Sequence, residues 1–308
     1  MIKSVAVTNY LGETLKMELA RPEESGFAIT KIKGLGPQKS TINMTEISTS
    51  DGGNINSSRR SARNIVLTLD FSFYSYRYNS IEEARHDTYK YFPGGYDLVL
   101  EIETDTRTAR IKGRVEDNDP DIFSKQETAM ISIICPDPNF YSAGAQGDNT
   151  VIFSGIEKVF EFPFENNSLT EPLIEFGSIE NKTEQVVVYH GDAKIGVTIT
   201  IHAVGDAEMI SIYNTGTREI MRIDTDKLKE MTGDGIISGD EIVICTVRNQ
   251  KKATLLRNGK ETNILNCLGK PIQWFSLSKG DNIFAYTATG GSSNLQFKVE
   301  NKIIYEGM

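Results

Sequence analysis

The stretch Ile131-Ser-Ile-Ile-Cys-Pro-Asp-Pro-Asn-Phe-Tyr141 divides the chain into two parts. It begins as an apolar run typical of a β-strand and then meets Pro136 and Pro138. Each proline removes a backbone donor and favours extended backbone in the residue before it, so a regular sheet cannot continue through them. The residues that follow, 142–149, are small and polar, as in a linker between domains.

We therefore predict an N-terminal domain over 1–143, a linker over 144–149 and a C-terminal domain over 150–308. A chain of 308 residues is long enough for two domains that each bury their own core. The residues expected to form the interdomain hinge are Cys135, Pro136, Pro138, Ser142, Gly144 and Gly147.

The charge and hydropathy of the chain exclude several classes of protein. Its 33 basic and 42 acidic residues give a formal net charge of −9, which disfavours a general nucleic-acid or membrane-surface binder. No run approaches the roughly 18 apolar residues of a membrane span. The first ten residues also lack the pattern of a signal peptide. We expect a soluble acidic protein that is made in the cytoplasm.

Apolar residues at every second position predict strands in the first domain. Positions 65, 67, 69, 71 and 73 are all apolar, which is the period of a half-buried strand. The ranges 96–102 and 109–115 alternate in the same way around 104–107. They predict a hairpin with one basic, solvent-facing side, which carries Arg110, Lys112 and Arg114. The cluster 117–121 predicts a turn after this hairpin.

One helix is expected in the first domain, over 80–92. Ser80 and Glu83 have the spacing of a capping box, and the run 93–95, Pro-Gly-Gly, ends the helical pattern. The second domain is almost purely β, with apolar alternation over 197–201 and 295–299 and a short helix over 225–231. Asn258-Gly259 predicts a two-residue type I′ hairpin turn, since both residues tolerate positive φ. An antiparallel sandwich fits this pattern.

The cysteines and histidines lack the spacing of a metal or catalytic site. No cysteine has a Cys-x-x-Cys partner, and we interpret all three as reduced packing residues. No histidine has a second histidine or a cysteine at ligand spacing. These residues are Cys135, Cys245, Cys267, His86, His190 and His202.

The acidic residues do not form a catalytic or calcium-binding pattern either. The range 232–241 clusters oxygen ligands, but Ile236 and Ile237 stand where an EF-hand loop needs ligands. The chain has no Gly-x-Ser-x-Gly, no phosphate-binding glycine loop and no His-Glu-x-x-His. We therefore expect no catalytic residue, no metal and no cofactor, and we do not interpret the protein as an enzyme.

Two further features bear on binding. Trp274 is the single tryptophan and could provide an aromatic platform for a sugar, although packing in the core is the favoured interpretation. The basic cluster Arg59, Arg60 and Arg63 is the most concentrated positive charge in the chain. It is either a solvated loop or a contact with an acidic patch on a neighbouring subunit.

The order of several short motifs resembles one known family. The hinge signature Cys-Pro-Asp-Pro-Asn-Phe-Tyr, 135–141, is similar to that of the distal tail protein (Dit) of long-tailed bacteriophages, a component of the tail-tip baseplate. The other matching segments span most of the chain and are 32–37, 51–53, 57–65, 239–240, 257–259, 274–283 and 305–307.

This resemblance implies a mainly β fold in two domains. The first would be a β-sandwich or split-barrel-like domain with one short helix, and the second a galectin-like antiparallel β-sandwich, or jelly roll. The first domains of six copies would close into a ring at the distal end of the virion tail, after assembly in the bacterial host cytoplasm. The partners implied are the tail tube protein, the tail-associated hub protein, and side fibres or receptor-binding proteins.

The net charge adds two expectations to this resemblance. DNA would pass through the lumen of the ring without specific binding, and no membrane would be bound. The alternative function is a carbohydrate-binding module that contacts the host cell envelope.

Overall fold

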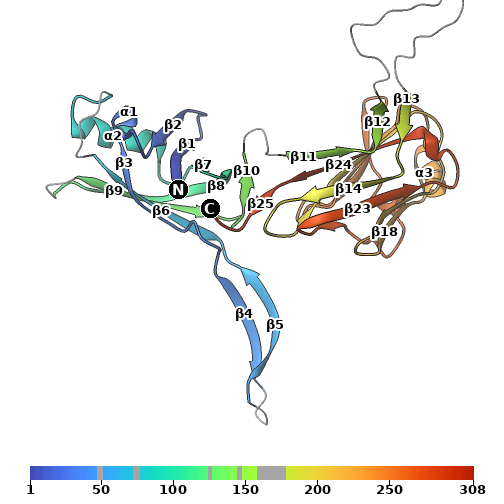
Figure 1. The fold of residues 1–308 in the computed structure, drawn as a ribbon, viewed down its shortest axis with the longest axis horizontal. Coiled ribbons are helices and arrows are strands. Elements are labelled where there is room, and N and C mark those ends of the chain that lie inside the picture. Colours follow the sequence, from blue (N-terminus) through green and yellow to red (C-terminus); the bar gives the residue numbers. More distant parts are fainter. Residues whose placement is uncertain (47–50, 72–76, 124–126, 144–147, 158–177) are drawn as a thin grey trace, which may run out of the picture. The chain divides into compact units, whose positions relative to one another are not determined.

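The computed structural model describes residues 1–46, 51–71, 77–123, 127–143, 148–157 and 178–308. The chain is mainly β, as expected, and forms two compact units (Figure 1). The first unit comprises Met1–Gly147 together with Ile304–Met308, and the second comprises Asp148–Ile303. The last five residues thus belong to the first unit, whereas the sequence led us to assign them to the second domain.

The first unit is built on an antiparallel sheet of nine strands. Seven strands run in the order β2-β1-β7-β8-β9-β6-β3, while β10 pairs with both β8 and β25. Its elements are β1 (Ile2–Thr8), β2 (Thr14–Glu18), α1 (Pro22–Ser25), β3 (Ala28–Lys33), β4 (Ser40–Glu46), β5 (Gly53–Arg60), β6 (Arg63–Asp70), α2 (Ile81–Tyr91), β7 (Asp97–Thr104), β8 (Thr108–Asp121), β9 (Thr128–Cys135), β10 (Phe140–Ser142) and β25 (Ile304–Tyr305).

Helix α2 begins and ends as the sequence predicts. The Ser80 hydroxyl accepts a hydrogen bond from the Glu83 amide at 3.1 Å, which satisfies one of the free N–H groups of the first turn. The Glu83 carboxylate in turn accepts from the Asn79 amide at 3.0 Å, one residue before the usual position in a capping box. These bonds hold the start of α2 in place.

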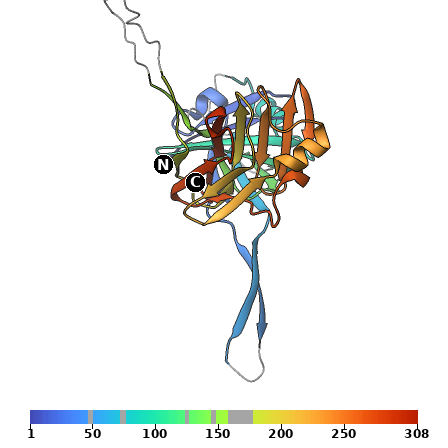
Figure 2. The ribbon, with the colours of Figure 1, turned by 90° about the vertical axis from the view of Figure 1, so that its right-hand side faces the viewer.

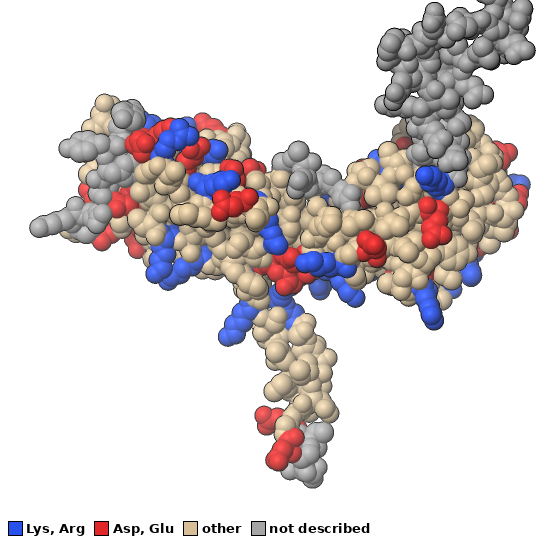
Figure 3. Space-filling view, in the orientation of Figure 1, with Lys and Arg blue, Asp and Glu red and all other residues tan. Residues whose placement is uncertain are grey.

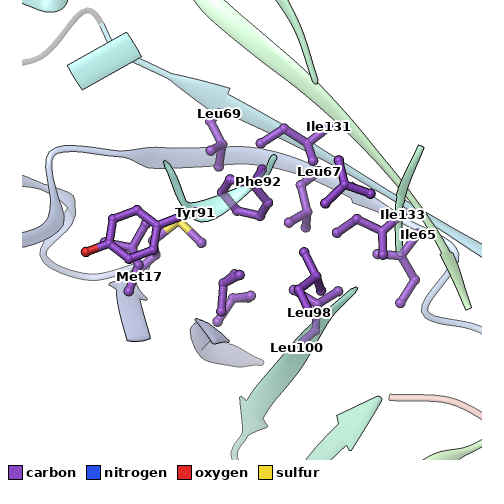
Figure 4. Packing of buried hydrophobic residues seen from close by; sticks show 14 of the residues in the cluster. Met17, Ile65, Leu67, Leu69, Tyr91, Phe92, Leu98, Leu100, Ile131 and Ile133 are labelled. Atoms are coloured by element: carbon purple, nitrogen blue, oxygen red, sulfur yellow. The ribbon is translucent and has the colours of Figure 1, made fainter. Parts of the chain in front are cut away.

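The core of the first unit lies between the sheet and the end of α2. Tyr91 and Phe92 pack against apolar side chains from β6, β7 and β9 (Figure 4), which alternate along each strand with half-buried or exposed residues. Fully burying a leucine or isoleucine stabilises a fold by about 1.5–3 kcal/mol. The buried strand residues labelled in this view are Ile65, Leu67, Leu69, Leu98, Leu100, Ile131 and Ile133.

Two features of the first unit differ from the sequence-based expectation. The range 117–121 is not a turn, because β8 continues to Asp121 and pairs with β9 throughout. Proline has no backbone N–H to donate to a neighbouring strand. Pro120 is tolerated in β8 because β7 stops pairing with β8 at Arg114, so on the β7 side no strand lies beside Pro120 to receive a hydrogen bond. A second, one-turn helix, α1, also precedes β3 and ends at Gly26, whose φ of 84° favours glycine.

The second unit contains a six-stranded sheet, β11-β24-β16-β19-β20-β21, and a four-stranded sheet, β14-β23-β17-β18. Tyr286 of the smaller sheet stacks on Phe297 of the larger one with ring centroids 3.7 Å apart, so their buried faces pack together as in a β-sandwich. The strands are β11 (Asp148–Ile152), β12 (Ser154–Glu157), β13 (Ser178–Asn181), β14 (Glu184–Tyr189), β15 (Ile195–Gly196), β16 (Thr198–Ala203), β17 (Ile210–Asn214), β18 (Glu219–Ile223), β19 (Glu241–Cys245), β20 (Lys252–Arg257), β21 (Lys260–Asn263), β22 (Ser276–Leu277), β23 (Gly280–Thr287) and β24 (Leu295–Lys302). The helices are α3 (Thr225–Thr232), η2 (Leu265–Cys267) and η3 (Ser292–Asn294).

Local predictions for the second unit are confirmed. Asn258 and Gly259 have φ of 51° and 75° and join β20 to β21, as a type I′ turn requires. Helix α3 occupies the predicted range, and the Asp224 carboxylate caps it by accepting from the Lys227 amide at 3.1 Å.

The range 232–241, which the sequence analysis considered as a calcium-binding loop, contains the buried carboxylate of an ion pair. Asp240, only 1% exposed, accepts from Arg257 Nε at 2.8 Å and Nη2 at 2.6 Å. Its second oxygen also accepts from the Ile237 amide at 3.0 Å. Both oxygens of the Asp240 carboxylate therefore accept hydrogen bonds from the protein, and these bonds order the loop.

Candidate assembly surface

Strands β4 and β5 form an arm that pairs with no other strand among the residues that the structure describes. They make a two-stranded sheet of their own and leave the body of the first unit (Figures 1 and 2). Every residue of the two strands is exposed except Arg60, which is half-buried. An isolated two-stranded hairpin is at best marginally stable in water. This segment therefore lacks the packing that stabilises the rest of the unit.

One face of the arm is apolar. Met44 lies directly opposite Ile55, and Ile42 lies two residues from Met44 on the same face. Ile42 and Met44 are each 54% exposed, and Ile55 is 66% exposed. We call these three residues the apolar face of the arm. Three large apolar side chains gathered on an unsupported hairpin indicate a surface that another molecule covers.

The two ends of the arm carry opposite charge. Acidic residues lie at its free end and basic residues lie at its root, where β4 begins and β5 ends (Figure 3). The acidic residues are Glu46 and Asp51, and the basic ones are Lys39, Arg59 and Arg60. Such a separation favours one orientation of an associating partner over the reverse.

The three arginines of the predicted ring contact are separated by the structure. Arg59 is exposed on the arm. Arg60 is 30% exposed and forms an ion pair with Glu306, with Nη1 and Oε1 at 3.3 Å. Arg63, by contrast, is 0% exposed. Only the first two can contact a neighbouring subunit, so the interpretation of Arg63 as a surface contact has to be corrected.

Arg63 is buried because its guanidinium binds four backbone carbonyls. Nε donates to Pro138 O at 2.8 Å, Nη2 donates to Glu306 O at 2.7 Å, and Nη1 donates to Gly36 O at 2.6 Å and to Gly34 O. The guanidinium also lies 4.6 Å from the centre of the Phe140 ring. Burial holds the pKa of Arg63 below its usual value, since the surrounding groups are dipoles and none is a carboxylate. We call this arrangement the carbonyl cage.

The predicted hinge residues lie mostly inside the first unit. Cys135 is the buried last residue of β9, Pro138 accepts from Arg63, and Ser142 is buried in β10. Burial also raises the pKa of the Cys135 thiol to about 11. Pro136 lies with them in the β9–β10 connection, whereas Gly144 and Gly147 fall outside the described residues. The segment 135–142 is therefore integrated into the first unit, and its role as a hinge stays a prediction.

Trp274 does not form an open aromatic platform. It is half-buried, while the next residue, Phe275, is 1% exposed and packs edge-on against Phe284. The Lys251 ammonium lies 5.1 Å from the centre of the indole ring, so part of that face is already covered.

Other candidate chemistry finds little support in the described parts of the chain. All three cysteines are buried, in agreement with their interpretation as packing residues. No group of three or more His, Cys, Asp or Glu side chains in those parts is placed to hold a metal ion. Within the same residues, no helix is both long and apolar enough to cross a bilayer.

Comparison with known proteins identifies the fold. No protein-family model matches the chain, and no curated protein matches its sequence. Among solved structures, SPP1 Dit, described as a paradigm of the hub adsorption apparatus in phages that infect Gram-positive bacteria, matches with a TM-score of 0.60 and 12% identity. The match covers 97% of this chain and 99% of that chain.

Two structures of the phage P2 baseplate in its activated conformation, with Ca and with Sr, match at 12% identity and TM-scores of 0.42 and 0.40. They cover 98% and 97% of both chains, but these scores are too low to support an argument about fold.

The fold and the exposed arm define a two-unit, mainly β protein with a surface suited to association. More particularly, its fold is that of SPP1 Dit over nearly the whole length of both chains. The resemblance to the Dit family is thus confirmed at the level of the fold. The apolar face of the arm was missed by sequence reasoning, although the alternation of Ile42 and Met44 with polar residues before Asp51-Gly-Gly53 is a hairpin signal.

Proposed function

We propose that this protein is a structural component of a phage tail tip, where six copies form a ring. In this proposal the ring joins the tail tube to the tail-associated hub protein and presents the second units to fibres or receptor-binding proteins. The protein acts through its surfaces and carries out no catalysis. The likeness of its fold to SPP1 Dit supports this role.

The observation that carries the proposal is the unsupported arm. Ile42, Met44 and Ile55 are more than half exposed on a hairpin to which no third strand of the described chain is paired. Burying them against another copy would remove apolar area from water at about 25 cal/mol per Å² and supply the support that an isolated hairpin lacks.

The kind of contact that the arm makes is compatible with closure into a ring. A projecting segment that docks on a different surface of the next copy forms a head-to-tail interface. Such an interface either propagates as a filament or closes, and the rotation between copies determines which occurs. We infer closure at six copies, with a lumen that lacks a basic lining, so that DNA passes without phosphate contacts to Lys or Arg.

The test is the solution mass of the full chain, measured by light scattering after size-exclusion chromatography over a range of concentrations. We expect a species of six times the 34.3 kDa chain mass. The variant Ile42→Ser/Met44→Ser/Ile55→Ser should stay monomeric, since it replaces the apolar face of the arm and leaves the core intact.

A matched control substitutes three apolar residues of the second unit that are also exposed. Ile152, Val204 and Leu256 are 54%, 48% and 40% exposed, and the triple serine variant at these positions should assemble like the unmodified chain. A monomeric unmodified chain at every concentration would contradict the ring. Equal assembly of the arm variant would exclude the arm as the contact.

A further inference from the structure

The last residues of the chain lie against both segments that connect the arm to the first unit (Figure 1). The entering segment, 35–39, leads into β4, and the leaving segment, 60–63, leads from the end of β5 into β6. We call the residues Ile304–Met308 the C-terminal strap. The strap follows the second unit in sequence but belongs to the first unit.

The strap holds the entering segment through direct contact between the two backbones. The Met308 amide donates to Leu35 O at 2.9 Å. At Gly307, a β-carbon would lie 2.9 Å from Leu35 O and 3.2 Å from the nitrogen of Pro37. The side chains of Leu35 and Met308 are also partly buried against the core of the first unit. Any side chain at position 307 would therefore force the strap and the entering segment apart.

The strap also holds the leaving segment. Arg60 Nη1 lies 3.3 Å from Glu306 Oε1, and Arg63 Nη2 donates to Glu306 O at 2.7 Å. Arg63 Nη1 donates to Gly36 O at 2.6 Å, so a single guanidinium joins the strap to both segments. The start and the end of the arm are thus fixed to the same five residues.

The first part of the strap is anchored on the main sheet. Tyr305 pairs with Phe140 and Ile304 pairs with Tyr141 of β10. Ile304 is 3% exposed, and the Arg107 guanidinium lies 4.5 Å from the centre of the Tyr305 ring. The sheet therefore fixes the position of the strap, and the strap in turn fixes the two segments of the arm.

Few other bonds attach the entering segment to the first unit. Apart from the bond from Arg63, the hydrogen bonds of 35–39 within the described chain are made to the strap or to the leaving segment. Gln38 Nε2 donates to Ala62 O at 2.9 Å, and the hydroxyls of Thr41 and Ser61 are 3.3 Å apart. These two bonds join the segments to each other, so they would not stop the arm from moving as a whole.

We propose that the C-terminal strap is a conformational device that sets the direction of the arm, so that assembly through the arm requires the strap to be seated. This inference rests on the proposed function, in which the arm docks on a second copy of the chain. A segment that already points in the docking direction loses less conformational freedom on binding. The coupling is reciprocal, so docking of the arm also stabilises the seated strap.

The variant Gly307→Val tests the proposal in the full chain. Its side chain cannot be placed beside Leu35 O, so the end of the strap leaves the entering segment, while Ile304 and Tyr305 keep their pairing with β10. We expect self-association to weaken by more than about 10-fold, which is the usual size of a coupling between two sites. Sedimentation velocity combined with light scattering measures the change.

The direction of the arm can be measured separately in a chain that does not assemble. Spin labels are attached at Asn54→Cys on the arm and Glu101→Cys on β7, in the background of the triple serine variant of the apolar face. The native cysteines are buried, which favours labelling of the introduced ones. Pulsed electron paramagnetic resonance should give a narrow distribution of label distances with the native strap and a wider one with Gly307→Val.

Two controls separate the strap from a general loss of stability. Ile102→Ala opens the core in β7, which pairs with neither the strap nor the arm. It should keep the narrow distribution and associate to within about 3-fold of the unmodified chain, because the strap stays seated. In the unmodified chain, assembly should slow hydrogen exchange of the Met308 amide by more than about 10-fold relative to the triple serine variant.

The outcomes separate this inference from the proposed ring. An unchanged distance distribution in Gly307→Val would overturn the strap and leave the ring standing. A wider distribution with unchanged self-association would overturn the requirement for the strap in assembly. An unmodified chain that stays monomeric at every concentration would overturn the ring and the link to assembly, while the label distances would still decide whether the strap directs the arm.

Discussion

Arg63 in the first unit is fully buried and Arg257 in the second is half-buried, and their charges are stabilised in different ways. Arg63 donates to four backbone carbonyls and stacks on Phe140. Arg257 binds both oxygens of the Asp240 carboxylate. The pKa of Arg63 is lowered by burial, whereas the hydrogen bonds that Arg257 donates to Asp240 raise the pKa of Arg257. Dipoles compensate less of the cost of burying a cation than an anion does.

The difference has a structural consequence. The carbonyls bound by Arg63 come from the root of the arm, from the connection before β10 and from the returning C-terminal segment at Glu306. The carbonyl cage therefore ties together three segments that are distant in sequence. The Arg257–Asp240 pair orders a single loop and its neighbouring strand. If Arg257 is lost, a second substitution at Asp240 can remove the carboxylate that is left without its partner. If Arg63 is lost, no substitution can remove the backbone carbonyls that are left without their donor.

The largest effect is expected for Arg63→Met. The variant leaves four carbonyls without their shared donor, and we expect the free energy of unfolding of the first unit to fall by about 3–5 kcal/mol. Arg63→Lys should recover little, because an ammonium cannot reproduce the planar fork. Hydrogen exchange, resolved for each unit, measures the loss. A decrease below about 1 kcal/mol would show that the cage is dispensable.

A smaller loss of stability, which a second substitution can partly restore, is expected for Arg257→Met. It leaves the Asp240 carboxylate buried without its cation and should destabilise the second unit by about 2–4 kcal/mol. Asp240→Asn in the same chain removes the charge, keeps an acceptor for the Ile237 amide, and should recover at least half of the loss. A double-mutant cycle followed by hydrogen exchange gives the coupling. Absence of recovery would contradict the distinction drawn between the two arginines.

Removal of residues 304–308 should have the smallest of the three effects, and it should act on the first unit. It deletes β25 and one of the four carbonyl acceptors, and it exposes the site of Ile304, so we expect a loss of about 2–3 kcal/mol. The second unit should keep its stability. Arg60→Ala is the control, because the part-exposed ion pair with Glu306 contributes under about 1 kcal/mol. Destabilisation of the second unit instead would contradict the assignment of this segment to the first.

Much of the local structure could be predicted because short-range rules decide it. The capping of α2 by Ser80 and the positive φ angles at Asn258 and Gly259 depend on side chains within a few residues. The basic face of β8 followed from simple alternation. The range 117–121 was misassigned because its composition favours a turn, while its pairing with β9 outweighs that propensity.

The candidate assembly surface was less predictable. Arg59, Arg60 and Arg63 look alike in a basic run, but the fold exposes the first, half-buries the second and encloses the third. The difference depends on where Gly34, Pro138 and Glu306 come together, and the local sequence of the arginines carries no such information.

The sequence by itself determined a mainly β chain with a proline boundary, one capped helix, a second short helix and a resemblance to a tail protein family. Only the tertiary structure decided that an arm stands unsupported and that the C-terminal segment belongs to the first unit. It also decided that β8 continues through 117–121 by pairing with β9. The physical reason is that alternation and capping act over a few residues. Burial and strand register are set instead by partners tens or hundreds of residues away.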